Sequence, residues 1–219
     1  MKRLPEPDLM DDPAQARAYA HADFAEAHQT FVTHFRERFP DFQAGEVIDL
    51  GCGPADVAIR YCRAYPSVRL LGVDGAVAML GLGLAAVEQA ALADRIELDQ
   101  RYLPDATLPS DCFDAVISNS LLHHLDDPLV LWQTIKQVGK PGAPVMVMDL
   151  RRPASVVDAM RLVGTHAAGA PSILQRDFYN SLLAAYRVQE VKRQLFKADL
   201  DHFRVEEVGD RHLLVWGIL

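Results

Sequence analysis

Two acidic residues and a glycine turn carry the first chemical signal in the sequence. Asp49 lies near the end of an apolar run and is followed by Gly51-Cys52-Gly53, a turn whose backbone can approach a ligand closely. A carboxylate beside that turn attracts a cationic group, whereas it would repel a pyrophosphate. In addition, Asp56 stands where the dinucleotide fingerprint would have its third glycine. The pattern therefore disfavours NAD or FAD and favours a ligand that carries positive charge.

The second acid is Asp74, which ends the run Gly72-Val73-Asp74, 21 residues beyond Gly53. A carboxylate at the end of the second strand of a parallel sheet hydrogen-bonds the two ribose hydroxyls of an adenosine ligand. Its alternative role is to cap the helix expected near Ala76, and the two roles are compatible. The sequence thus predicts an adenosine ligand at this edge of a sheet.

These residues require strands whose carboxyl ends meet. Short β-branched runs alternate with helical patterns between residues 46 and 150, which predicts a parallel sheet with right-handed crossovers and helices on both faces. The expected strands are 46–51, 68–74, 95–100, 113–119 and 144–150, and the expected helices are 54–65, 76–92 and 128–140. Further helices are expected from about 155 and over 175–198. Two final strand-like runs are separated by only three residues, 209–211, which predicts an antiparallel pair at the end of the sheet.

The N-terminal region has a different pattern. Residues 13–39 are rich in alanine and aromatic residues, with Phe24, Phe31 and Phe35 at helical separations, which predicts one or two amphipathic helices. We therefore divide the chain into an N-terminal helical extension, residues 1–44, and an α/β domain, residues 45–219.

The order and spacing of the motifs resemble those of the class I S-adenosylmethionine-dependent methyltransferases, small-molecule type. The matching segments lie between residues 46 and 150 and are Asp49-Leu50-Gly51-Cys52-Gly53, Gly72-Val73-Asp74, Leu108-Pro109 with Phe113-Asp114-Ala115-Val116-Ile117-Ser118, Leu122-His123-His124-Leu125-Asp126-Asp127-Pro128, and Gly142-Ala143-Pro144-Val145-Met146-Val147-Met148-Asp149. The resemblance implies a Rossmann-like, seven-stranded, mostly parallel sheet with an antiparallel C-terminal strand. It also implies S-adenosylmethionine as cofactor, S-adenosylhomocysteine as product, and methyl transfer by in-line displacement.

The resemblance further implies a set of cofactor-binding residues. They are Asp49, Gly51, Cys52, Gly53, Asp74, Gly75, Leu103, Pro104, Asn119 and Tyr19. Many family members have an aspartate after the third strand that contacts the adenine amino group, and here that position is Pro104. Asp105 is one place out of register, so apolar contact with Leu103 and backbone groups is the alternative to an Asp105 contact. Tyr19 is expected near the methionine carboxylate if the extension forms a lid, and the alternative is a helix that merely packs its apolar stripe on the domain.

Three histidines and one further acid are candidates for the acceptor side. His123 is the candidate general base, because an ordinary histidine pKa of about 6.5 lets the ring accept a proton at neutral pH. A structural role beneath the loop is its alternative. His28, His124 and Asp149 are candidate substrate-binding residues. A surface ion pair is the alternative for Asp149.

Composition excludes several classes of partner. The chain has 219 residues and a formal net charge of -8, which disfavours nucleic acid and anionic membranes. No metal site is predicted, because the three cysteines are scattered and the histidines lack ligand spacing. No apolar run reaches the roughly 18 residues that span a bilayer, and the acidic start is unlike a signal peptide, so we expect a cytoplasmic protein.

We predict a methyltransferase that acts on a small molecule. The alternatives are a methyltransferase acting on protein or tRNA and a non-catalytic, cofactor-binding regulatory protein. The acceptor atom and the oligomeric state stay open.

Overall fold

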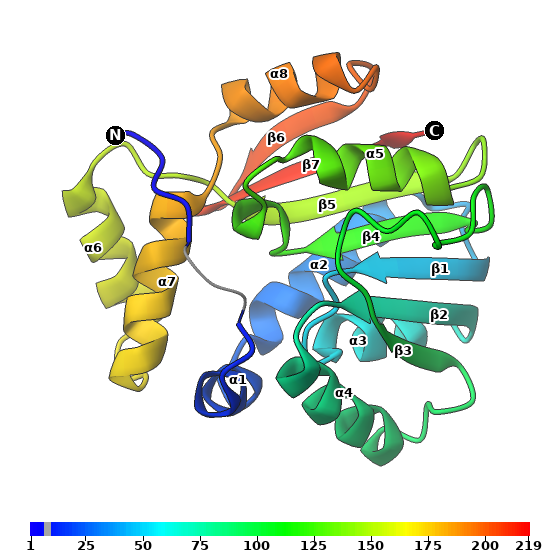
Figure 1. Cartoon of the computed structure of the whole chain (residues 1–219), viewed down its shortest axis with the longest axis horizontal. Helices are drawn as coiled ribbons and strands as arrows, with labels where there is room; N and C mark the ends of the chain where they lie inside the picture. Colours follow the sequence, from blue (N-terminus) through cyan, green and yellow to red (C-terminus); the bar gives the residue numbers. More distant parts are fainter. Residues whose placement is uncertain (7–9) are drawn as a thin grey trace.

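A seven-stranded sheet forms the centre of the molecule, a computed structural model that describes residues 1–6 and 10–219 (Figure 1). In spatial order the strands are β3 (Ile96–Gln100), β2 (Ser67–Asp74), β1 (Ala44–Leu50), β4 (Ala115–Asn119), β5 (Pro144–Leu150), β7 (His212–Ile218) and β6 (Arg204–Val208). Strands β1 to β5 pair in parallel, and β7 is antiparallel to both of its neighbours. The predicted Rossmann-like sheet with its antiparallel C-terminal strand is confirmed.

Helices cover both faces of this sheet. One face carries α2 (Ala25–Arg38), α3 (Asp56–Ala64) and α4 (Val77–Gln89), and the other carries α5 (Leu129–Val138) and α8 (Val188–Lys197). The parallel strands point toward α1 (Pro13–Ala20), α6 (Val156–His166) and α7 (Ser172–Ala184), which lie beyond their carboxyl ends (Figure 1). A short 3-10 helix, η1 (Leu122–His124), follows β4 at the same end.

Consecutive residues of the central strands contribute to two separate cores. Val47 packs with Phe35 and Tyr61 on the face covered by α2 and α3. Ile48 packs with Trp132 on the face covered by α5. Because neighbouring side chains of a strand point to opposite faces, a strand between two helical layers needs apolar residues at successive positions. The nearly continuous apolar runs in β1 and β5 meet this requirement, and every residue of β5 is buried.

Helix α3 begins two residues later than the sequence pattern predicts. Pro54 was expected in the first helical turn, but it lies in the preceding turn and the helix begins at Asp56. Ala55 precedes the helix with a φ of 65°, a left-handed conformation that turns the chain between the glycine turn and the helix. The turn after β1 therefore extends further along the chain than expected.

The prediction of a single helix over residues 175–198 is wrong, because the structure has two helices in this region, α7 and α8. The chain is extended between them, and the carbonyl of Tyr186 accepts a hydrogen bond from the N–H of Arg152 at 3.2 Å. The Glu190 carboxylate accepts a hydrogen bond from the N–H of Arg187 at 2.8 Å, and this contact caps the start of α8. Pairing with the segment after β5 thus overrides the helical pattern.

Helix α1 bridges two parts of the domain. It begins after Asp12, whose carboxylate accepts from the N–H of Gln15 at 2.9 Å. The Gln15 side chain donates to Asp177 of α7 at 2.8 Å. Asp11 accepts from the N–H of Ala78, in the first turn of α4, at 2.9 Å. These contacts place α1 between α4 and α7, at the carboxyl end of the sheet (Figure 1).

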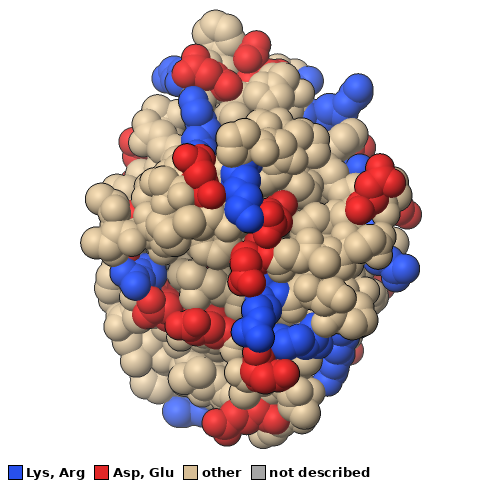
Figure 2. Space-filling view, turned by 90° about the vertical axis from the view of Figure 1, so that its right-hand side faces the viewer, with Lys and Arg blue, Asp and Glu red and all other residues tan. Residues whose placement is uncertain are grey.

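The opposite end of the molecule carries mixed charge. Figure 2 shows the face at the amino ends of the parallel strands, where Lys and Arg side chains lie interspersed with Asp and Glu. Alternating signs on this face do not provide the single-sign patch that would track a nucleic-acid backbone. Within the described ranges, none of the helices combines the length and the apolar character needed to cross a bilayer.

Candidate active site

The glycine turn and the end of β2 are tied together by backbone hydrogen bonds. The N–H groups of Gly51 and Cys52 donate to the carbonyl of Val73 at 2.8 and 3.1 Å. The N–H of Gly53 donates to the Asp74 carboxylate at 2.8 Å, and the N–H of Ala76 donates to the other oxygen of that carboxylate at 2.8 Å. An ionised carboxylate offers about four lone-pair sites, so Asp74 retains acceptor capacity after both contacts. Asp74 thus holds the N–H of Ala76, the residue before α4, while Asp11 binds the first-turn N–H of Ala78, and the ribose-binding role of Asp74 is compatible with this geometry.

Asp49 is a buried carboxylate without a protein partner. Its side chain lies near the end of β1, the residue is 1% exposed, and neither carboxylate oxygen has a hydrogen-bond partner among the described residues. Burial, together with the nearby charge of Asp74, raises the pKa of Asp49 to about 7. Because an unpaired buried carboxylate is costly, this side chain is poised for a cationic ligand. The residues thus fit a ligand that brings positive charge to the end of β1.

The two glycines of the turn differ in their surroundings. A Cβ at Gly51 would lie 2.8 Å from the Cβ of Leu121, whereas a Cβ at Gly53 would meet no atom of the described chain within 4 Å. The Cys52 side chain packs toward β2, since a Cβ at Gly72 would lie 2.9 Å from its sulfur. Gly51 is therefore required by packing, and Gly53 leaves open space beside Asp74.

This difference predicts unequal effects of two alanine substitutions. Both glycines have positive φ, 75° at Gly51 and 52° at Gly53, which costs an alanine about 1 kcal/mol. Gly51→Ala must also displace Leu121, so we expect a total loss of about 2–4 kcal/mol in the free energy of unfolding, against about 1 kcal/mol for Gly53→Ala. Urea denaturation of both variants measures these losses. Equal losses would show that contact with Leu121 does not limit the turn.

Tyr19 and Asn119 lie at the same end of the sheet. Burial, and then the charges of Asp74, Asp56 and Asp149, raises the pKa of Tyr19 to about 12. The Tyr19 ring packs 4.8 Å from the ring of Phe24. Asn119 ends β4, and its buried Oδ1 has no partner among the described residues.

The loop after β3 holds the residues expected near adenine. Leu103 is half-buried against the core on the α5 face, and Pro104 is exposed. Both oxygens of Asp105 are bonded within this loop, one to Thr107 at 2.7 Å and the other to Arg101 at 3.2 Å. Unlike Asp49, Asp105 already has charged and polar partners. This geometry favours the apolar alternative, contact with Leu103 and backbone groups. At the end of β2, the carbonyl of Gly75 accepts from Gln100 at 3.2 Å.

His123 and Asp149 form a buried pair. The Nδ1 atom of His123 lies 2.6 Å from Oδ1 of Asp149, and the two residues are 2% and 1% exposed. Burial by itself lowers the pKa of His123, but the charge and hydrogen bond of Asp149 outweigh it, so the pKa is raised above its usual value. The surface ion pair considered for Asp149 is wrong, because its partner is this buried ring. Since Asp149 engages Nδ1, the Nε2 atom is left to accept a proton.

His124 has a carboxylate partner that the sequence did not reveal. Its Nδ1 lies 2.7 Å from Oε2 of Glu6, and Oε1 of Glu6 accepts from the Ser181 hydroxyl at 2.6 Å. Burial raises the pKa of Glu6, but the hydrogen bond and charge of His124 prevail and lower it to about 2. The rings of His123 and His124 lie 4.1 Å apart. Two carboxylate–histidine pairs therefore stand side by side, and no local pattern around Glu6 signals this.

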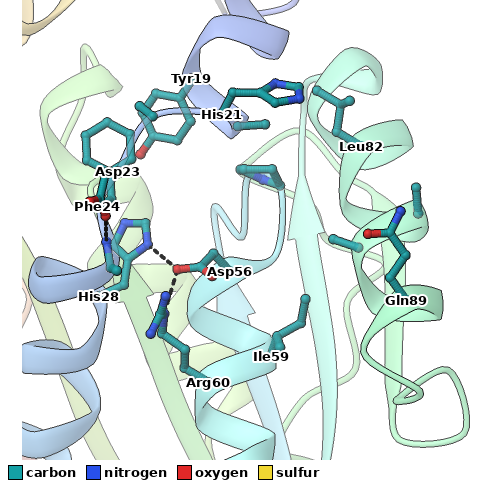
Figure 3. Close-up of a pocket in the computed structure, with 16 residues that line it drawn as sticks. Tyr19, His21, Asp23, Phe24, His28, Asp56, Ile59, Arg60, Leu82 and Gln89 are labelled. Atoms are coloured by element: carbon teal, nitrogen blue, oxygen red, sulfur yellow. Dashed lines mark hydrogen bonds and ion pairs between the residues drawn. The ribbon is translucent and has the colours of Figure 1, made fainter. Parts of the chain in front are cut away.

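His28 lies in a different environment. Its Nδ1 is 2.7 Å from Oδ2 of Asp56, which also accepts from Arg60 at 2.7 Å (Figure 3). These three residues line a cavity of about 410 Å³ between the α1–α2 connection, α3 and α4. Tyr19, near the end of α1, lines the same cavity, so α1 contributes to both regions. The structure thus pairs His28 with the start of α3 and places it apart from the His123 pair.

Comparison with known proteins gives consistent matches. Residues 47–142 match a family model described as a methyltransferase domain. A demethylmenaquinone methyltransferase of Porphyromonas gingivalis is 32% identical over 52% of this chain and 47% of its own length. The ubiquinone/menaquinone biosynthesis C-methyltransferase UbiE of Syntrophotalea carbinolica is 29% identical over 78% of this chain and 70% of its own length. This chain spans about half the length of most of the curated relatives it matches.

Solved structures share the fold. A SAM-dependent methyltransferase from Aquifex aeolicus superposes with a TM-score of 0.68 at 18% identity, over 94% of this chain and 98% of that chain. The plantazolicin methyltransferase BpumL, solved with SAH, gives a TM-score of 0.67 at 12% identity, over 94% of this chain and 91% of that chain.

The fold and its carboxyl-end site are those of a Rossmann-like domain that binds an adenosyl cofactor. Residues 47–142, which form most of the strands and turns of the site, match a methyltransferase domain, and the relatives and the shared fold support a class I S-adenosylmethionine-dependent methyltransferase. Members of this class are enzymes, and their cofactor is S-adenosylmethionine.

Proposed function

We propose that this protein transfers a methyl group from S-adenosylmethionine to a small-molecule acceptor. The observation that carries the proposal is the buried carboxylate of Asp49, which has no hydrogen-bond partner among residues 1–6 and 10–219 and lies beside a glycine turn tied to Asp74. A dinucleotide cofactor would bring negative charge to this position, whereas the adenosyl sulfonium compound brings an adenosine for Asp74 and positive charge for Asp49.

Each proposed contact uses a group available in the structure. Asp74 would accept hydrogen bonds from the ribose hydroxyls with its remaining lone pairs, and Gly53 leaves room beside it. Tyr19 and Asn119 would orient the methionine end, and Leu103 would pack against adenine. When bound, the cofactor supplies an electrophilic methyl group on a positively charged sulfur.

The buried pair of His123 and Asp149 would accept a proton from the methyl acceptor. With Nδ1 held by Asp149, His123 is oriented to take a proton on Nε2 from an acceptor hydroxyl, thiol or acidic carbon. Positioning of the two reactants supplies the larger share of the rate, since near-attack geometry can lower a barrier by roughly 7–11 kcal/mol. General-base catalysis adds typically 10²–10⁴-fold.

Two features support a small acceptor. The two curated relatives described above are named as methyltransferases of menaquinone or ubiquinone biosynthesis, and a quinone is a small-molecule acceptor. Helix α1 spans from α4 to α7 over the carboxyl ends of the strands, and we assign α1 the role of a lid over the site, whereas α2 of the extension packs in the core on one face of the sheet. A lid limits the size of the acceptor and excludes water.

Calorimetry with S-adenosylmethionine and S-adenosylhomocysteine tests cofactor binding. We expect saturable one-to-one binding of both compounds, and no binding of either at millimolar concentration would end the proposal. Incubation with a panel of hydroquinones, phenols and thiols, with S-adenosylhomocysteine formation as readout, tests the acceptor class. Cofactor binding without transfer to any of these, together with tight capture of a partner protein, would favour the regulatory alternative.

Asp74→Ala tests the ribose contact. Loss of a charge-assisted hydrogen bond is expected to weaken cofactor binding by about 1.5–3 kcal/mol. Asp94→Ala is the matched control, because Asp94 is exposed in the turn before β3. An affinity of Asp74→Ala equal to that of the control would remove the ribose assignment.

A further inference from the structure

Three potential metal ligands converge between the N-terminal segment and η1. They are Glu6, His123 and His124, and each contributes one ligand atom within 4.8 Å of the other two. The sequence predicts no metal site, because its cysteines are scattered and its histidines lack ligand spacing, and Glu6 is far from the histidines along the chain. Residues 1–6 bring it there, since Arg3 donates to the carbonyls of His123 and Leu125 at 2.9 and 3.1 Å.

Two of these ligands, His123 and Glu6, already have a supporting hydrogen bond from a residue outside the cluster. Asp149 holds Nδ1 of His123 at 2.6 Å, so Nε2 is the atom left for an ion. Ser181 donates to Oε1 of Glu6 at 2.6 Å, which leaves Oε2 toward His124. Metal-binding histidines and carboxylates are typically oriented by such second hydrogen bonds.

The charges around the cluster attract a cation. Glu6 and Asp149 are largely buried carboxylates, with side chains 10% and 1% exposed, and each contacts a histidine ring nitrogen. The nearby guanidinium of Arg3 donates hydrogen bonds to three backbone carbonyls, those of Ala184, His123 and Leu125. A metal ion would take the place of the contact that joins Nδ1 of His124 to Oε2 of Glu6.

We propose that Glu6, His123 and His124 form a binding site for a divalent transition-metal ion. Two imidazoles and one carboxylate select Zn²⁺, Fe²⁺, Co²⁺ or Ni²⁺ over Mg²⁺ and Ca²⁺, which prefer oxygen ligands. Ligand atoms around a tetrahedral zinc ion lie about 3.3 Å apart. The three ligand atoms lie within 4.8 Å of one another, so rotation of their side chains would bring them to that spacing.

The site has a consequence for methyl transfer that rests on the proposed function. An ion on Nε2 of His123 occupies the atom that would take the acceptor proton. Metal-loaded protein is therefore expected to lose base-assisted transfer, and a chelator is expected to restore it. Metal binding itself is measured without any acceptor, so its failure is distinguishable from failure of the proposed function.

The test is titration of tag-free, full-length protein with Co²⁺ and Zn²⁺. Saturable one-to-one binding of Co²⁺ is expected, followed by its visible absorption band and by competition with a chromogenic chelator, with displacement by Zn²⁺ and none by Mg²⁺. Glu6→Gln and His124→Ala are expected to weaken binding by about 10–100-fold or more, and Ser181→Ala by about 10-fold.

Matched controls separate this site from adventitious binding. Glu26→Gln and His21→Asn alter exposed residues of the same types and are expected to leave the affinity within about twofold of the unchanged protein. S-adenosylhomocysteine binding and circular dichroism report whether each variant is folded. Absence of saturable binding by the unchanged protein would overturn the proposal. So would binding that a folded Glu6→Gln or Ser181→Ala variant retains in full.

Discussion

Asp49→Asn is expected to weaken S-adenosylmethionine binding by about 10–100-fold while stabilising the ligand-free protein. Asparagine keeps the shape of the side chain but removes the charge that would face the cationic ligand, and hydrogen bonds to charged groups contribute about 1.5–3 kcal/mol. In the ligand-free protein the same charge is buried without a partner among the described residues. Its removal relieves a penalty of about 4 kcal/mol, from which the cost of a buried unpaired amide, about 1–3 kcal/mol, must be subtracted.

The stabilisation should depend on pH in a defined direction. The pKa of Asp49 is raised from 3.8 to about 7 on folding, so the folded protein binds the proton more tightly than the unfolded chain. The contribution of this group to stability is fully present below about pH 4, is lost as pH rises toward 7, and is lowest above 7. Urea denaturation of Asp49→Asn and unchanged protein should therefore differ little at pH 4.5 and by about 1–3 kcal/mol at pH 8.

Binding of the cofactor should show the complementary pH dependence. Protonation of Asp49 below about pH 7 removes the charge, so the affinity of the unchanged protein for S-adenosylmethionine should fall as pH decreases from 8 to 5.5. The Asp49→Asn variant should lack this dependence, and exposed Asp94→Asn should retain it. An Asp49→Asn variant that binds as tightly as unchanged protein at pH 8 would show that the carboxylate does not face the ligand.

Substitution of His123 or of its partner Asp149 is expected to have the second large effect, a loss of kcat. His123→Ala is expected to lower kcat by about 10²–10⁴-fold, because it removes the proposed general base. Asp149→Asn should lower kcat by a comparable factor, because the amide no longer fixes the ring with its Nε2 atom available. Cofactor affinity should stay within about threefold in both variants, since neither side chain is assigned to the cofactor. The measurement is S-adenosylhomocysteine formation at saturating acceptor, with calorimetry for the cofactor.

The pH profile distinguishes catalysis from packing. Asp149 raises the pKa of His123 above its usual value against the effect of burial, so kcat/KM should fall as pH drops through that raised value. His202→Asn is the control, because the His202 ring contacts the carbonyl of Ile218, which pairs with the start of β5 at the amino ends of the parallel strands. An unchanged kcat in a folded His123→Ala variant would reassign the pair to a structural role.

The parallel half of the fold could be predicted from sequence because its signals are local. The apolar runs of β1 and β5 must be buried on both faces, and the short 209–211 connection permits only a hairpin. The polar residues that interrupt these runs, Asp49 and Asp149, are therefore visible as candidates at strand ends. Parallel pairing then brings their carboxyl ends to one edge.

The remaining features depend on contacts between distant segments. The break between α7 and α8 follows from pairing of Tyr186 with the chain after β5, which no local pattern announces. Glu6 reaches His124 because residues 1–6 pack along α7 and η1. The ring of His28 packs 5.5 Å from the ring of Phe24, but its hydrogen-bond partner Asp56 lies on another helix. Side-chain partners across helices were thus beyond sequence reasoning, whereas strand-end positions were not.

The most direct test is a crystal structure of the protein with S-adenosylhomocysteine. We predict the ribose hydroxyls within hydrogen-bonding distance of the Asp74 carboxylate and the amino-acid portion beside Gly51, Gly53 and Asp49. Density for the nucleoside elsewhere on the molecule, or protein atoms filling the space beside Gly53, would contradict the proposed site.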